Sequence, residues 1–316
     1  MAFKKGTAQD ICDLVNQLED FITQNGWVSQ KDNQISPYTR TYDFNGTGEQ
    51  VILPRFFKGS GLAGHNEIYI SMAVHYNKQQ GYYTLGMYAN RSYDKTKAWN
   101  KQYKAQDYAV FTSMWEQPMP YWFFATGRRF IFVAKVANRY ASMYGGMFLP
   151  SGTDLEYPYP VMAGGNHISY NQNYGQSNIG SSRSFWSPAT NRDSGGSYSS
   201  LFAYRPDYSH MWFAGAYASS RGFHSWSTAN YGHTHPYVKD FWVGRSADDN
   251  QHLILPIDLW EQSPNQQVLG TLDGCCFITG HLNAPESEVT VEGKTYLCFP
   301  ALIQSDFNDY VAIEKA

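Results

Sequence analysis

The chain has 316 residues, 42% of them hydrophobic, which is enough for one large or two medium-sized domains. Only 16% of the residues are charged and the net charge is -3, so the chain lacks the basic field that recruits nucleic acid or anionic membranes. Aromatic residues make up 17%, with 25 Tyr and 9 Trp, a composition that favours strands and aromatic contact surfaces.

Neither the start of the chain nor its cysteines indicate export. Residues Met1 to Gly6 are polar and no apolar segment follows them, so we expect no signal peptide. No run of about 18 apolar residues occurs, so we expect no membrane span. The cysteines lack C-x-x-C spacing, and we expect reduced thiols rather than disulfides or a zinc site. They are Cys12, Cys275, Cys276 and Cys298.

One amphipathic helix is predicted near the N-terminus. Its apolar residues follow helical spacing and would form one buried stripe. They are Ile11, Leu14, Val15, Leu18, Phe21 and Ile22. Thr7 is the expected N-cap, with Asp10 as its capping-box partner, and Gly26 is the expected C-cap. The stripe is short, so packing on a sheet is favoured over a coiled coil.

The segment Gly59 to Gly64, GSGLAG, matches the G-x-G-x-x-G pattern of a dinucleotide-binding turn. Such a turn needs a helix after the glycines, because the helix N-terminus holds the pyrophosphate. Here apolar residues alternate from Ile68 to Val74, which predicts a strand. We therefore predict a glycine-rich connection between two strands and no nucleotide cofactor.

Most of the remaining chain has the pattern of short strands separated by turns. Hairpins are predicted where Ile68–His75 is followed by Tyr83–Ala89, where Trp122–Ala125 is followed by Phe130–Val136, and at Glu288–Pro300. The predicted fold class is mainly β, or α+β. It comprises antiparallel sheets or a sandwich, one N-terminal helix and a long loop-rich insertion.

The insertion divides the chain into three predicted regions. Residues 1–163 would form the helix and a β-rich core, 164–245 the Gly/Ser/Tyr-rich insertion, and 246–316 strands that complete the core. The insertion is too aromatic to stay solvated, so we expect it to pack against the sheet or, preferably, against a neighbouring subunit. The expected interface residues there are Phe185, Trp186, Trp212, Phe213 and Trp226.

The sequence contains no convincing catalytic or metal-binding motif. His233 and His235 would share one face of a strand, and Asp240 is near them in the sequence. No third residue has a spacing typical of metal ligands, so no metal is predicted. No nucleophile motif occurs in its required context, and we expect no enzyme. Arg128 and Arg129 lie in a predicted hairpin turn; a solvated turn or an intersubunit salt bridge is favoured over an anion site.

Five stretches together resemble a family of structural proteins from tailed bacteriophages with contractile tails. They are Lys4 to Trp27, Gly59 to Ile70, Met119 to Val136 (MPYWFFATGRRFIFVAKV), Met147 to Gly165, and Leu269 to Ala301. The region 164–235 lies outside the resemblance. The family has no catalytic motif to carry over.

The resemblance implies a virion component, assembled in the bacterial host cytoplasm, that forms a ring at the neck and collar or at the baseplate. Its partners would be further copies of itself, with threefold or sixfold symmetry, and other phage tail, neck or baseplate proteins. Neither nucleic acid nor membrane would be a direct partner. The alternative is a receptor- or carbohydrate-binding tail protein, which would need Trp and Tyr side chains with convergent carboxylates.

Overall fold

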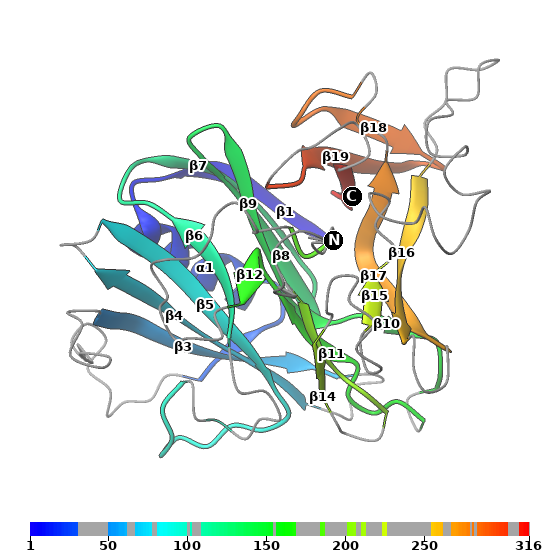
Figure 1. Ribbon diagram of the computed structural model, residues 1–316, viewed down its shortest axis with the longest axis horizontal. Helices are drawn as coiled ribbons and strands as arrows, with labels where there is room; N and C mark the ends of the chain where they lie inside the picture. Colours follow the sequence, from blue (N-terminus) through cyan, green and yellow to red (C-terminus); the bar gives the residue numbers. More distant parts are fainter. Residues whose placement is uncertain are drawn as a thin grey trace, which may run out of the picture.

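In the part of the chain that the structure describes, three antiparallel sheets and one helix form a three-layered β protein (Figure 1). The mainly β fold predicted from the sequence is confirmed. The computed structural model describes residues 1–30, 50–61, 67–77, 81–99, 102, 109–153, 156–168, 184–186, 201–206, 210–212, 223–225, 254–261, 267–278, 280, 283–302 and 310–315.

The central sheet is buried on both faces. Its strand order is β1 (Ala2–Ala8), β7 (Met119–Ala125), β8 (Arg129–Val136), β9 (Arg139–Met147), β11 (Val161–Gly164), β13 (Leu201–Tyr204) and β14 (His210–Trp212). In β7, Tyr121 and Phe123 face one core cluster, whereas Trp122 and Phe124 face the other. A strand buried on both faces is a continuous apolar run, which explains the sequence YWFFA.

A six-stranded sheet covers one face of the central sheet and contains Gly59 and Ser60, the first two residues of the glycine motif. Its order is β12 (His167–Ile168), β6 (Val110–Met114), β5 (Tyr82–Asn90), β4 (Glu67–Asn77), β3 (Gln50–Ser60) and β2 (Val28–Ser29). Gly59 pairs with Ile68 in a β3–β4 hairpin, so a strand follows the glycines, as predicted. A Cβ on Gly59 would lie 2.9 Å from the ring of Trp27, which explains the glycine by close packing.

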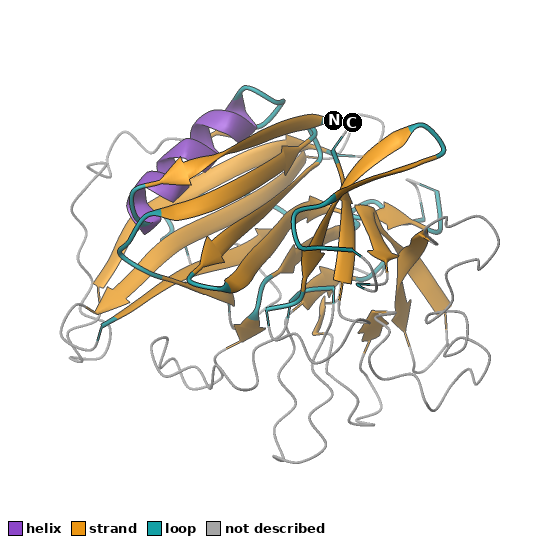
Figure 2. Ribbon diagram, turned by 90° about the horizontal axis from the view of Figure 1, so that it is seen from above, coloured by secondary structure: helices purple, strands orange, loops and turns teal. Residues whose placement is uncertain are grey.

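The third sheet covers the opposite face of the central sheet. Its order is β15 (Phe223–Ser225), β16 (Ile254–Glu261), β17 (Gln267–Ile278), β20 (Tyr310–Glu314), β19 (Lys294–Pro300) and β18 (Glu288–Val291), and β10 (Leu149–Pro150) also pairs with β17. The predicted β18–β19 hairpin is confirmed. The two chain ends lie side by side (Figure 2), where the Lys315 amine lies 5.1 Å from the Phe3 ring centroid.

The predicted helix, α1 (Ile11–Thr23), forms, but its predicted caps were wrong. Thr7 belongs to β1 and pairs with Pro120 of β7, because pairing continues to Ala8. Asp10 is the N-cap, and its Oδ1 accepts a hydrogen bond from the Asp13 N–H at 2.8 Å. The C-cap is Gln24, and Gly26 takes a left-handed φ of 96° two residues later.

Helix α1 joins two layers of the fold. Its apolar stripe belongs to the cluster between the central and six-stranded sheets. Its Gln17 accepts a hydrogen bond from the Tyr121 hydroxyl of β7, and Glu19 forms a 2.5 Å ion pair with Arg55 of β3. The helix therefore fastens the N-terminus to both sheets.

Segment 164–245 supplies edge strands rather than only loops. Strand β12 is at the edge of the six-stranded sheet, β13 and β14 end the central sheet, and β15 ends the third. Among the described residues, strands from segment 164–245 therefore belong to all three sheets, and the predicted boundaries at 163 and 245 do not separate one sheet from another.

Candidate functional site

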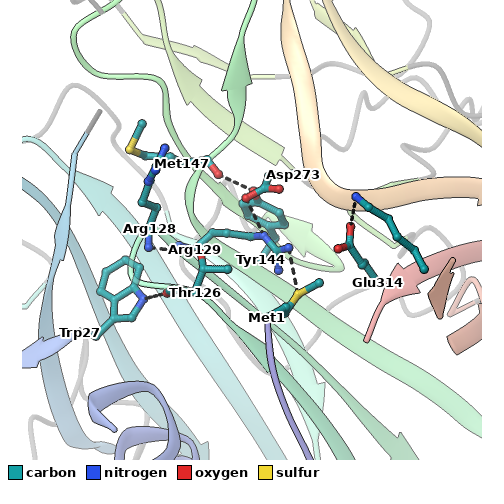
Figure 3. Close-up of polar contacts among 10 residues, drawn as sticks. Met1, Trp27, Thr126, Arg128, Arg129, Tyr144, Met147, Asp273 and Glu314 are labelled. Atoms are coloured by element: carbon teal, nitrogen blue, oxygen red, sulfur yellow. Dashed lines mark hydrogen bonds and ion pairs between the residues drawn. The ribbon is translucent and has the colours of Figure 1, made fainter. Parts of the chain in front are cut away.

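The β7–β8 turn separates the two predicted interface arginines. Arg128 is exposed, whereas Arg129 is only 1% exposed and points into the core beneath the third sheet (Figure 3). Neighbouring residues of a strand face opposite sides, so Arg129, at the start of β8, is directed inward like Ile131. The two residues therefore have different roles.

Backbone hydrogen bonds hold the turn in one conformation. We call residues Thr126, Gly127 and Arg128 the arginine turn. The Thr126 N–H donates to the Arg129 carbonyl at 2.9 Å, and the Arg128 carbonyl accepts from the Met147 N–H at 2.9 Å. The Trp27 indole N–H donates to the Thr126 carbonyl at 2.8 Å. Because these hydrogen bonds fix the backbone of the turn, little backbone entropy is lost when Arg128 binds a partner.

Arg129 links the central sheet to the third sheet. Its Nε lies 2.9 Å from Oδ2 of Asp273 in β17, and its Nη2 donates to the Met1 sulfur at 3.1 Å. Burial alone would lower the pKa of Arg129, but Tyr144 and Asp273 raise it, so the guanidinium stays charged. The favoured expectation of a solvated turn or intersubunit salt bridge was wrong for Arg129, because its carboxylate partner belongs to the same chain.

Tyr144 and Cys275, which lie beside Arg129, are held in their neutral forms. Burial raises the pKa of Tyr144 and of the Cys275 thiol well above their ordinary values. The Tyr144 hydroxyl donates a hydrogen bond to the carbonyl of Met147, whose N–H is bonded to the Arg128 carbonyl of the arginine turn. A thiol that stays protonated is a poor nucleophile.

A small hollow of about 230 Å³ opens beside the arginine turn. It is lined by Thr126, Arg128, Met147, Phe148, Leu149 and Asp273. Leu149 is 49% exposed and Met1, bound to Arg129, is 39% exposed. Large apolar side chains that remain in water beside a rigid charged turn are typical of contact surfaces.

Phe185 and Trp186 lie inside their own chain. They are 0% and 2% exposed and form a T-shaped pair with ring centroids 4.9 Å apart. Phe185 also packs on Tyr144 of the central sheet, with centroids 5.6 Å apart. The prediction that these two residues contact a neighbouring subunit was wrong, because the space between the central and third sheets already buries them.

The remaining predicted interface residues are Trp212, Phe213 and Trp226. The backbone of Trp212 pairs with Phe202 in β13–β14. Phe213 and Trp226 lie outside the described residues, as do His233 and His235, which were considered as metal ligands and not predicted to bind one.

A second hollow, of about 210 Å³, was not predicted from the sequence. We call it the acidic hollow; it is lined by Asp10, Ile11, Cys12, Ile52, Val74, Tyr76, Tyr83 and Glu116. Tyr76 and Tyr83 stack with centroids 6.1 Å apart and an interplanar angle of 6°. The Tyr83 hydroxyl donates to Glu116 at 2.5 Å. These residues come from α1 and its N-cap, from strands β3, β4 and β5 of the six-stranded sheet, and from the connection between β6 and β7, so no sequence spacing could have revealed them.

The Tyr83 phenol should ionise only in strong base. Its hydrogen bond to Glu116, followed by partial burial, raises the pKa of Tyr83 to about 12. An unperturbed tyrosine has a pKa of about 10, so the stabilising effect is complete below pH 10 and is lost as the pH rises through about 12. NMR titration of the Tyr83 ring, assigned by its loss in Tyr83→Phe, should show this midpoint.

The variant Glu116→Gln tests whether the hydrogen bond to Glu116 raises the pKa of Tyr83. It should return the pKa of Tyr83 toward the ordinary value while leaving Tyr69 unchanged, since the pKa of Tyr69 is also raised to about 12 but its partner is Glu67. An unchanged Tyr83 midpoint in Glu116→Gln would refute the assigned partner.

Comparison with known proteins gives no family assignment: no family model matches the chain, and a search of curated proteins returns no match. Within the described ranges, no three His, Cys, Asp or Glu side chains gather as metal ligands. No helix in the part of the chain that the structure describes has the length and hydropathy of a bilayer-spanning segment.

Proposed function

We propose that this protein is a non-enzymatic structural component of a tailed bacteriophage particle, which assembles into a ring in the contractile tail machine at the neck and collar or the baseplate. The observation that carries the proposal is the resemblance of five stretches to such proteins. In the fold these stretches form connected framework elements: α1, β7, β8, β11, β18 and β19 among them.

The division between framework and edge supports the same proposal. Strands β12, β14 and β15 come from residues 167–225, outside the resemblance, and each ends one of the three sheets, with β13 next to β14. At the opposite ends, β1 and β18 belong to the resembling stretches, and β2 directly follows one of them. A shared framework with one individual edge on each sheet suits a particle component whose neighbours differ between phages. Edge strands are also where a sheet meets another chain.

Immunogold electron microscopy of the intact particle tests this proposal. An antibody against the purified chain should label the neck or the baseplate, and mass spectrometry of purified particles should detect the chain. Particles free of both label and peptide would overturn the proposal.

The acidic hollow favours one alternative, a receptor- or carbohydrate-binding tail protein. Its two stacked tyrosines and two carboxylates provide an aromatic face and hydrogen-bond acceptors of the kind that hold a sugar ring. A glycan array should give a signal that Tyr76→Ala removes if this alternative holds. A blank array, together with a blank polysaccharide-degradation assay, would exclude it.

A further inference from the structure

The arginine turn and the acidic hollow lie at opposite ends of the same strands. In the β1–β7 pair, Ala8 faces Met119 and Ala2 faces Ala125. Asp10 and Glu116 therefore lie just beyond one end of the pair. Arg128 lies beyond the other end, three residues after Ala125. Seven residues of strand separate the ends, a distance of about 20 Å.

The charges at the two ends have no ion-pair partner among the described residues. Neither Asp10 nor Glu116 is within 4.0 Å of a described cationic nitrogen, and Arg128 is not within that distance of a described carboxylate. In contrast, Arg129 and Arg55 are each paired within the chain. The charges that lack an ion-pair partner among the described residues thus have opposite sign at the two ends.

The size and lining of the acidic hollow suit a single basic side chain. Its volume of about 210 Å³ is below the roughly 300–1,000 Å³ of pockets for drug-sized ligands. Ile11, Ile52 and Val74 supply an apolar lining for an aliphatic stem, while the stacked tyrosines and the two carboxylates favour a guanidinium. Arginine combines these two properties and pairs with carboxylates in a fixed geometry.

We infer that the acidic hollow of one copy of this chain receives Arg128 of a second copy. The inference rests on the proposed function, and it names the contact by which the ring would form. Because donor and acceptor surfaces differ and face opposite ways, the contact is heterologous, and repetition of one such contact closes a ring or continues as a filament. Leu149 beside the turn would add apolar area at the same contact.

Charge reversal tests the contact. Arg128→Glu and Glu116→Arg, measured separately by sedimentation velocity, should each weaken self-association at least about tenfold, because each places like charges together. Arg128 is exposed, so Arg128→Glu should melt like the unaltered protein. Glu116→Arg also loses the hydrogen bond from Tyr83, so its assembly is measured well below its own melting temperature. Arg139→Glu, which alters an exposed arginine beyond the other end of β8, is the matched control and should assemble normally.

Mixing the two reversed variants gives the sharpest outcome. The introduced carboxylate at position 128 of one variant then faces the introduced guanidinium at position 116 of the other. Where the two variants alternate, the unaltered Arg128 and Glu116 also meet, so an equimolar mixture should assemble into filaments or rings with an even number of subunits, although each variant alone assembles weakly.

Three results would count against the inference. If both single variants assemble as well as the unaltered protein, the inferred contact is wrong, whereas the proposal that the protein forms a ring stands. A monomeric unaltered chain would overturn both the inference and the ring. A glycan that binds in the acidic hollow without preventing self-association would also overturn the inference.

Discussion

Asp273→Ala should lower the free energy of unfolding by about 3–5 kcal/mol, because it leaves the Arg129 guanidinium buried without its carboxylate. The Arg129 side chain is 2% exposed, so in the native fold its guanidinium has little contact with water. Urea denaturation followed by tryptophan fluorescence measures the change. An effect below about 1 kcal/mol would show that the ion pair does not hold the two sheets together.

A double-mutant cycle separates the ion pair from the packing around it. Arg129→Met removes the charge and keeps much of the side-chain volume, so the double variant with Asp273→Ala should be more stable than Asp273→Ala alone. Arg128→Met, at the neighbouring exposed arginine, should change stability by less than about 0.5 kcal/mol. Equal losses in the single and double variants would contradict a coupled pair.

Phe185→Ala should destabilise the chain by about 3–5 kcal/mol, because it opens a cavity in a fully buried cluster. The loss should appear in the unfolding of a dilute, unassembled protein. This outcome distinguishes a residue of the chain's own core from a residue of a subunit interface, where the sequence had suggested that Phe185 lies.

The control for Phe185 is an exposed apolar residue. Leu149→Ala should leave unfolding nearly unchanged, since Leu149 is 49% exposed, and should weaken assembly instead. If Phe185→Ala were stable when dilute and deficient only in assembly, the buried position of Phe185 would be wrong.

Local signals in the sequence were sufficient to predict the hairpins and the helix. The β18–β19 hairpin was predictable because Glu292-Gly293 supplies the two left-handed residues of a tight turn, with φ of 51° and 77°. Strand β1 was missed because it is an edge strand with exposed Lys4 and Lys5, and so has no alternating apolar pattern. Its pairing also displaced the helix cap from Thr7 to Asp10.

The candidate sites depended on contacts that no local pattern encodes. Arg128 and Arg129 are adjacent and chemically identical, and only the partner from β17, Asp273, distinguishes their roles. Asp10, Tyr83 and Glu116 likewise meet only because the start of the helix, strand β5 and the connection between β6 and β7 lie at the same place. Sequence spacing alone therefore located the arginine turn but could not predict its buried half or the acidic hollow.

The oligomeric state of the purified chain tests most directly the proposal that this protein builds a ring. Sedimentation velocity over a wide concentration range, with electron microscopy of the same samples, should show one discrete oligomer and closed rings of uniform size. A chain that remains monomeric at every concentration, with no rings in the images, would contradict the proposal.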